Sequence, residues 1–344
     1  MRLARGWRCV GLAALAISFW SVRCCPAQEN PLGDVHTPEP AKSTVPKDDR
    51  PVVTGKDVAA KATSSPGSEI RVDVNMVLVP VTVTDPMNRL VTGLERENFQ
   101  VMDDGVAQTI KSFATDDSPL TIGIVFDLSG SMSSKFVRAR KALSAFLRTC
   151  NPKDEFFVVG FNDRPAVIVD YTSEADDVEA RMVMLRPENR TALIDAMYLG
   201  VNHLKQAKYD RKALLVISDG GDNRSRYTQG ELTRAVRESG VQVYSIGIFD
   251  MYAPTEEEQN GPILLRDISE ATGGRLFKVL DVQDLADIAQ RISEELRNEY
   301  VLGYTPTDRR RNGAWRKLKV RLIPPAGLPP LEQHSREGYY APSQ

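Results

Sequence analysis

Between residues 120 and 296, short apolar runs alternate with segments whose apolar residues recur at helical spacing. The runs predict an edge strand at Ala166–Tyr171 and five further strands, at Thr121–Phe126, Glu155–Phe161, Lys212–Ser218, Val241–Ile248 and Arg275–Val279. The helical spacing predicts helices from Phe136, from Leu193 and from Val282 to Arg297. Strands separated by helices favour a mostly parallel sheet with helices on both faces. We therefore predict a doubly wound α/β domain over residues 119–297.

The segments on either side, 69–117 and 298–342, have the patterns of β structure. Valines from Val72 to Val83 approximate the alternation of a half-buried strand, and the stretch after Phe99 is typical of a hairpin that turns near Asp104-Gly105. Strands at Tyr300–Tyr304 and Trp315–Ile323 follow the α/β domain. Each segment is too small to be stable alone, so we predict that the two pair as a β-sandwich-like unit.

The N-terminus has the layout of a secretory signal peptide over residues 1–27. Arginines 2, 5 and 8 precede a short apolar stretch, and Cys25-Pro26-Ala27 provides a cleavage site. An uncleaved membrane anchor is the alternative, and a lipoprotein signal fits less well because Arg23 precedes Cys24. Residues 28–68 are polar and rich in proline, which predicts a disordered linker. We expect an exported protein of the periplasm, the cell envelope or the extracellular space, with no membrane span in the mature chain.

Charge and cysteine content limit the possible partners and the possible disulfides. Cleavage after residue 27 would remove four arginines and no acidic residue, leaving 40 basic and 46 acidic side chains and a formal charge of −6. A mildly acidic chain argues against nucleic acid as the main partner. Cys150 would be the last remaining cysteine, so we expect no internal disulfide. The oligomeric state is left open.

Three predicted loops would bring oxygen-bearing side chains to one edge of the sheet. Asp127, Ser129 and Ser131 follow the first strand, Thr191 precedes the helix from Leu193, and Asp219 follows the strand at Lys212–Ser218. In open α/β sheets, ligands collect at the carboxyl ends of the strands. Carboxylates and hydroxyls are suitable ligands for a hard cation such as Mg²⁺. The aspartate-serine-serine loop alone could instead be a strand-to-helix turn with a serine cap.

Taken together, these residues resemble a known family. The pattern Asp-x-Ser-x-Ser, the later threonine before a helix and the later Ser-Asp-Gly after a strand are similar to the metal-ion-dependent adhesion site of von Willebrand factor type A domains. A preceding Asp-Asp-Gly hairpin and a following Tyr300-Val-Leu-Gly-Tyr304 resemble the bacterial secreted members. The resemblance covers about residues 70–342 and implies a Rossmann-like fold. One departure is Asn189-Arg190, where glycines are common.

The resemblance also implies a metal site and a function. Its five ligands would be Asp127, Ser129, Ser131, Thr191 and Asp219, and its metal Mg²⁺, or Mn²⁺ or Ca²⁺. The hydroxyls of Ser129 and Ser131 would bind directly, the aspartates directly or through water, and Thr191 when a partner is present. Few direct carboxylates leave the ion electron-poor, so an Asp or Glu of another protein would complete its coordination. We thus expect a metal-dependent protein-binding module that is not an enzyme.

Several alternatives remain beside this interpretation. An envelope scaffold with an incidental metal site is one, and a metal-dependent phosphohydrolase is another. The phosphohydrolase would need a second aspartate where Ser129 stands. A serine hydrolase would need a Gly-x-Ser-x-Gly motif and a histidine base, but Ser129 lacks the first glycine and none of the three histidines (His36, His203, His334) has a visible catalytic partner. Asp222 and Asn223 could support the site but are more typical of a turn. Residues 250–262 are expected to form a solvated loop at the rim of the same face.

Overall fold

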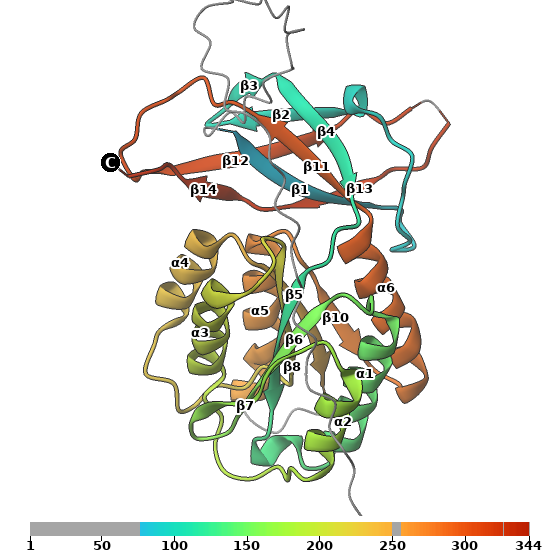
Figure 1. The fold of residues 1–344 in the computed structure, drawn as a ribbon, viewed down its shortest axis with the longest axis vertical. Coiled ribbons are helices and arrows are strands. Elements are labelled where there is room, and N and C mark those ends of the chain that lie inside the picture. The colour runs from blue at the N-terminus through green and yellow to red at the C-terminus, as the bar shows by residue number, and fades with distance from the viewer. Residues whose placement is uncertain (1–75, 250–255, 326, 344) are drawn as a thin grey trace, which may run out of the picture. The chain divides into compact units, whose positions relative to one another are not determined.

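The structure of this protein is a computed structural model that describes residues 76–249, 256–325 and 327–343. The chain divides into two units, Met1–Ser68 and Glu69–Gln344. The signal peptide (1–27) and the linker (28–68) lie outside the described residues and stay predictions. The second unit contains the α/β domain and the β strands that flank it (Figure 1).

A six-stranded sheet forms the centre of the α/β domain. Its strand order is β10-β9-β8-β5-β6-β7, and all neighbours are parallel except β6 and β7. The strands are β5 (Thr121–Asp127), β6 (Glu155–Phe161), β7 (Pro165–Thr172), β8 (Lys212–Ser218), β9 (Gln242–Ile248) and β10 (Leu276–Val279). Every residue of β5 and β9 is buried, as expected of parallel strands covered on both faces. All six strands were predicted, and the edge strand β7 is antiparallel.

Helices cover both faces of this sheet (Figure 1). One hydrophobic cluster joins the sheet to α1 (Phe136–Thr149), α2 (Ala175–Val183) and α6 (Leu285–Arg297). A second cluster joins it to α3 (Leu193–His203), α4 (Gln229–Ser239) and α5 (Glu256–Ala271). Phe126 belongs to the first cluster and its neighbour Val125 to the second, as strand alternation requires. The doubly wound α/β fold class is thereby confirmed. Short 3-10 turns occur at Arg96–Asn98, Gly130–Met132, Leu204–Gln206 and Val282–Asp284.

The prediction of a loop at residues 250–262 is wrong for the part of this segment that the structure describes. Helix α5 begins at Glu256 and includes Pro262, while residues 250–255 lie outside the described residues. Pro262 lies beyond the first turn of α5, where a proline removes one backbone hydrogen bond of the helix and is unfavourable. Gly261 and Pro262 are both poor helix formers, but the apolar contacts of Leu265 and Ile268 with the sheet favour the helix.

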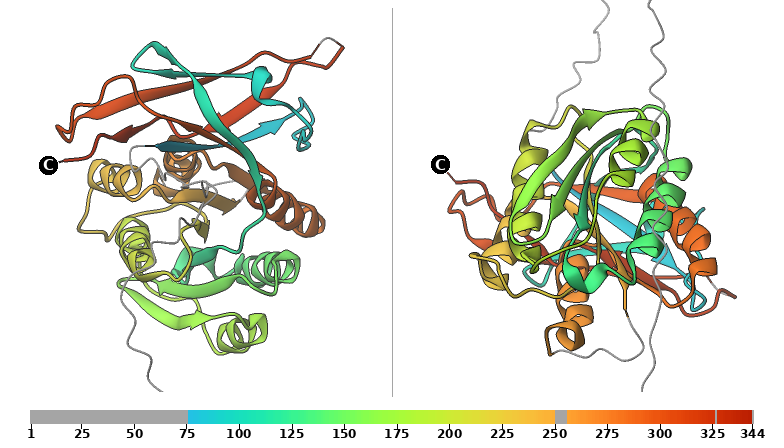
Figure 2. Two further views of the ribbon diagram at one scale, coloured as in Figure 1. Left: turned by 45° about the horizontal axis from the view of Figure 1, so that its top comes forward. Right: turned by 90° about the horizontal axis from the view of Figure 1, so that it is seen from below.

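The flanking segments form two four-stranded sheets around a core of their own (Figure 2). The first has the order β13-β1-β11-β4 and the second β14-β12-β2-β3. Strands that precede the α/β domain pair with strands that follow it, as β1 with β11 and β2 with β12. Their bounds are β1 (Val77–Thr84), β2 (Phe99–Asp103), β3 (Val106–Gln108), β4 (Ile110–Asp116), β11 (Glu299–Tyr304), β12 (Trp315–Leu322), β13 (Glu332–Ser335) and β14 (Gly338–Tyr340).

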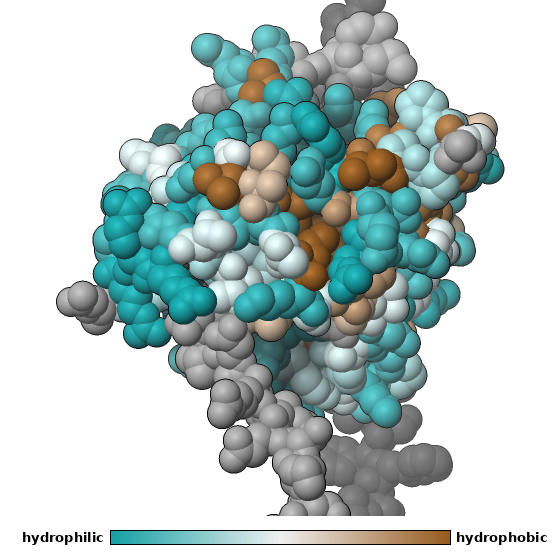
Figure 3. All heavy atoms as spheres, turned by 90° about the horizontal axis from the view of Figure 1, so that it is seen from above, coloured by the Kyte–Doolittle hydropathy of each residue, from teal (hydrophilic) through white to brown (hydrophobic). Residues whose placement is uncertain are grey.

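The hairpin predicted at Asp104-Gly105 is present between β2 and β3. Asp104 has φ 46° and Gly105 has φ 82°, the left-handed conformation that two-residue hairpin turns require. The surface of this β unit is mostly hydrophilic with scattered hydrophobic patches (Figure 3), and its exposed apolar residues include Leu78, Val106 and Ile323.

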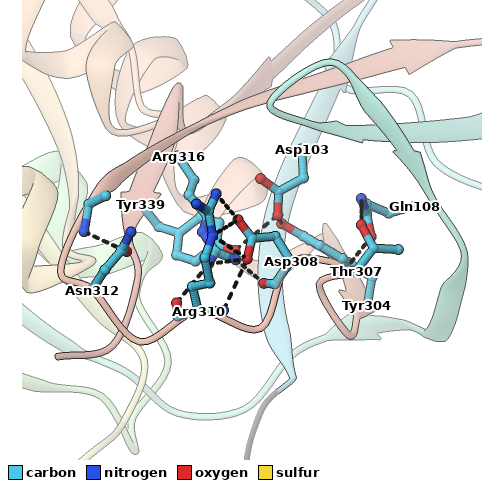
Figure 4. A network of polar contacts seen from close by, with 10 residues as sticks. Asp103, Gln108, Tyr304, Thr307, Asp308, Arg310, Asn312, Arg316 and Tyr339 are labelled. Carbon is cyan, nitrogen blue, oxygen red and sulfur yellow. Dashed lines mark hydrogen bonds and ion pairs between the residues drawn. The ribbon is translucent and has the colours of Figure 1, made fainter. Parts of the chain in front are cut away.

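A polar network stabilises the interior of the β unit (Figure 4). The hydroxyls of Tyr304 and Tyr339 donate to Oδ2 of Asp103 over 2.8 and 2.9 Å. The guanidinium of Arg316 donates to the carbonyls of Asp308 and Arg310. These buried polar groups are paired within the protein, as stability requires, so we interpret the network as structural.

Candidate functional site

The first loop of the candidate site follows β5. Asp127 and Ser129 have no solvent-exposed surface, and Ser131 is half-buried. The backbone N–H of Ser129 donates to Oδ1 of Asp127 over 2.8 Å, and the hydroxyls of Ser129 and Ser131 are hydrogen-bonded at 3.1 Å. Three oxygen-bearing side chains are therefore held together at the carboxyl end of a central strand.

The second loop, which precedes α3, is bonded to the first through its backbone. Gly130 N–H donates to the carbonyl of Asn189 over 2.9 Å, and Glu188 N–H donates to the carbonyl of Leu128 over 2.8 Å. Asn189 has φ 69°, a left-handed conformation that asparagine tolerates better than most residues. Asn189 thus takes a conformation that glycine usually provides. Thr191, two residues later, is buried.

The third loop, after β8, contacts both of the others. The hydroxyl of Ser218 donates to Oδ2 of Asp127 over 2.5 Å. Asn223 joins the second loop, because its N–H donates to the Thr191 carbonyl (3.0 Å) and its Oδ1 accepts from Thr191 N–H (3.1 Å). Asp222 accepts from the N–H of Ile194, at the start of α3, over 2.8 Å.

A close backbone approach fixes the third loop beside α5. Gly220 has φ +80°, and a Cβ atom there would lie 2.5 Å from the carbonyl oxygen of Gly261. A Cβ on Gly261 would in turn lie 2.2 Å from the carbonyl oxygen of Asp219. Both positions exclude any larger side chain, so the two glycines allow the helix to pack against the loop.

A lysine lies next to this cluster. The ammonium of Lys135 donates to Oδ2 of Asp219 over 2.9 Å, and each side chain is 1% exposed. Gly221 N–H donates to the other oxygen of Asp219 over 3.2 Å. The ion pair connects the start of α1 with the third loop.

The loops therefore bring the five predicted residues to one edge of the sheet. Asp127, Ser129 and Ser131 are directly hydrogen-bonded neighbours, and Thr191 and Asp219 lie on loops that bond to theirs. Asp163, in the loop after β6, accepts from Arg190 N–H over 3.0 Å. Asp222 and Asn223 are more than turn residues, because each is bonded to the second loop or its helix.

Burial and like charge shape the electrostatics of the site. Loss of solvent, followed by the negative charge of Asp219, raises the pKa of Asp127 to about 7. Two buried carboxylates that repel one another provide an environment in which additional positive charge is favourable.

The donor set fits a hard cation. It consists of two carboxylates and three hydroxyls, all oxygen ligands of the kind that Mg²⁺ takes. Among the described residues, no group of three or more His, Cys, Asp or Glu side chains is placed to hold a metal. A metal at this site would therefore depend in part on hydroxyl ligands. Because hydroxyls are neutral, they would offset little of the positive charge of the ion.

Two residues, Lys135 and Ser218, were assigned no role at the site from the sequence. Lys135 lies four and seven residues before the buried Ala139 and Ala142, a spacing that places it on the buried face of α1. Ser218 directly precedes Asp219 at the strand end, next to the position that had been selected. The helical spacing of Lys135 and the adjacency of Ser218 to Asp219 could therefore have indicated both residues.

The surface beside the third loop is hollowed. A cavity of about 460 Å³ is lined by residues of this loop, of α3 and of α5, including Ile194, Gly220, Asp222, Asn260 and Leu264. The hollow lies beside the third loop, which carries Asp219.

Comparison with known proteins identifies the domain. Residues 121–221, which include all five predicted ligands, match the family model of the von Willebrand factor type A domain. The chain therefore contains a von Willebrand factor type A domain, and this match indicates a protein-interaction or adhesion module.

Individual relatives are distant. An uncharacterized protein of Borreliella burgdorferi is 23% identical over 183 residues, which are 46% of this chain and 54% of that protein. The chain thus spans about half the length of the curated relative that it matches.

Similar solved structures include BatB from Bacteroides thetaiotaomicron (18% identity, 51% of this chain, 98% of that chain, TM-score 0.42). A von Willebrand factor type A protein from Catenulispora acidiphila has 16% identity over 78% of this chain and 62% of that chain, with a TM-score of 0.45. The vWF domain of the type V pili tip protein Mfa5 from Porphyromonas gingivalis has 12% identity over 53% of this chain and 95% of that chain, with a TM-score of 0.43.

Proposed function

We propose that this protein is an exported adhesion module that binds a divalent cation and, through it, an acidic side chain of another protein. The observation that supports the proposal is the arrangement of two buried carboxylates and three hydroxyls on three loops that are hydrogen-bonded to one another. Asp127, Ser129, Ser131, Thr191 and Asp219 would hold Mg²⁺, Mn²⁺ or Ca²⁺. The ion would supply an electron-poor position for a partner's carboxylate.

The side chains of this protein would bind the ion and orient its ligands. The serine hydroxyls can offer neutral lone pairs, and Ser218 and the Ser129 N–H orient the carboxylate of Asp127. We propose a binding role without catalysis. Export rests on the predicted signal peptide, and none of the helices in the described part of the chain combines the length and apolar character needed to cross a membrane.

Thermal unfolding with and without Mg²⁺ tests the metal site. We expect Mg²⁺ at roughly millimolar concentration to raise the Tm of the wild type, because a ligand that binds the folded state preferentially stabilises it, and EDTA to reverse the increase. Asp127→Ala and Ser131→Ala should lose it. Ser133→Ala is the matched control, since Ser133 is exposed and its hydroxyl is bonded to the carbonyl of Gly130. A wild-type Tm that changes with neither Mg²⁺ nor EDTA would exclude the metal site.

A pull-down from envelope extract tests the binding function. Wild-type protein should capture a partner in Mg²⁺ and release it in EDTA, whereas Asp127→Ala should capture nothing above background. Capture that is equal in all conditions would instead favour the envelope scaffold with an incidental metal site. Hydrolysis of a generic phosphate ester, lost in Asp127→Asn, would favour the phosphohydrolase.

A further inference from the structure

Lys135 places a buried positive charge beside the candidate metal site. Its ammonium and Oδ2 of Asp219 are 2.9 Å apart, with 1% exposure on each side chain. Because the other oxygen of Asp219 accepts from Gly221 N–H, the carboxylate is held at both oxygens. Lys135 therefore fixes the orientation of one of the two aspartates at the site.

A contribution to stability is a weak explanation for this pair. Removing two charges from water costs about as much as their attraction returns, and apolar residues often replace buried ion pairs without loss. The pair has a clearer effect on the charge of the site. Asp127 and Asp219 together carry two negative charges, and the adjacent ammonium cancels one of them.

We propose that Lys135 sets the charge of the candidate metal site so that a bound divalent cation retains attraction for a partner's carboxylate. The inference rests on the proposed function. With Lys135, the two carboxylates and a divalent ion sum to one positive charge, whereas without it they sum to zero. Since Coulomb interactions scale with charge, Lys135 weakens binding of the metal and strengthens binding of the acidic ligand. An ammonium has no lone pair, so Lys135 acts as a positioning residue and not as a ligand.

Two titrations by calorimetry on the full chain test this. The first measures the Kd for Mg²⁺ after chelator treatment, and the second measures the Kd for acetate with Mg²⁺ saturating. Lys135→Met, which keeps the length and removes the charge, should bind Mg²⁺ about tenfold more tightly, or about 1.4 kcal/mol. The same variant should bind acetate about tenfold more weakly. Lys135→Gln should shift both constants in the same directions, so the test does not depend on the folding of one variant.

Two control variants complete the design. Lys135→Arg keeps the charge and should resemble the wild type in both titrations. Lys141→Met removes an exposed charge from α1, the helix that Lys135 directly precedes, and should leave both constants unchanged. A merely structural role for Lys135 predicts that Lys135→Met and Lys135→Gln weaken both metal and acetate binding.

The outcomes separate this inference from the proposed function. If the wild type binds Mg²⁺ and the uncharged variants bind it equally or more weakly, the role of Lys135 is overturned and the metal site stands. If neither the wild type nor the variants bind Mg²⁺, both ideas fail. If only the uncharged variants bind it, the effect of Lys135 on the metal is supported, while the proposed function of the natural chain is overturned.

Discussion

The hydroxyl of Ser218 donates a hydrogen bond to Oδ2 of Asp127 across 2.5 Å, and neither side chain has solvent-exposed surface. The bond joins the ends of the neighbouring strands β8 and β5. The same hydroxyl accepts from Gly220 N–H over 2.9 Å, so it also organises the third loop. A buried carboxylate that faces a second one depends on such charge-assisted donors.

Replacement of Ser218 should therefore cost more than replacement of an ordinary buried serine. We expect Ser218→Ala to lower the free energy of unfolding by about 2–3 kcal/mol, because the bond to a carboxylate is lost and Gly220 N–H loses its acceptor. Ser245→Ala is the matched control, since Ser245 is equally buried and is bonded to the neutral hydroxyl of Ser269. It should cost about 1 kcal/mol. Equal losses in urea unfolding would contradict the charge-assisted bond.

Gly220 should not tolerate a side chain. Gly220→Ala combines a left-handed backbone with a Cβ atom 2.5 Å from the carbonyl oxygen of Gly261. Gly240→Ala is the control, because Gly240 has φ +68° with no atom within 4 Å of a Cβ there. We expect about 1–2 kcal/mol of destabilisation at Gly240 from the backbone alone. Gly220→Ala should cost about 1–3 kcal/mol more from overpacking, and a difference near zero would mean that the loop and α5 move apart easily.

Asp103 should be essential for the stability of the β unit. Asp103→Ala leaves the buried hydroxyls of Tyr304 and Tyr339 without their shared acceptor, so we expect a loss of about 3 kcal/mol. In a background with Tyr304→Phe and Tyr339→Phe, the same substitution should cost much less, since donors and acceptor are removed together. Urea unfolding of the wild type and the three variants gives the coupling free energy between Asp103 and the two tyrosines. An unchanged cost in the double background would show that the network contributes no such coupling.

Stability should fall as the pH rises through neutrality, with Glu299 as one cause. Burial raises the pKa of Glu299 to about 7, although Gln242 donates to it over 2.6 Å and Arg211 lies 3.6 Å away. A pKa above the unfolded value of 4.5 means that the stabilisation is fully present below about pH 4.5 and is lost as the pH rises through about 7. Glu299→Gln stays neutral and should become progressively more stable relative to the wild type between pH 5 and 8.

Other groups titrate in the same range, so the comparison must be a difference between variant and wild type. Burial also raises the pKa of Glu295 to about 7, which adds to the effect. Burial lowers the pKa of His334 to about 4, so its contribution is present above about pH 6.5 and is lost as the pH falls through about 4. Urea unfolding of the wild type and of Glu299→Gln at each pH gives a difference in which the contributions of Glu295 and His334 largely cancel. A constant difference from pH 5 to 8 would refute the role of Glu299.

The parts of the fold with strong periodicity were predictable. The six strands of the α/β sheet and helices α1, α3 and α6 follow from apolar runs and helical spacing. Helix α4 was missed because Leu232 and Val236 are its two buried residues, which is a weak pattern. Its capping box, Thr228 with Glu231, and its C-terminal Gly240 were signals that could have located it. Helix α2 is short and therefore gives a weak pattern. Helix α5 contains Gly261 and Pro262, which are unfavourable in a helix.

Strand ends and residue types are local properties, so the amino-acid sequence alone indicates which oxygen-bearing side chains stand at the ends of which strands. How the three loops meet depends on contacts between distant parts of the chain. The bonds from Gly130 to Asn189 and from Ser218 to Asp127 join residues that are distant in the chain. The pairing of Lys135 with Asp219 was likewise decided only in three dimensions, since the folded core removes both charges from water and leaves each as a partner for the other.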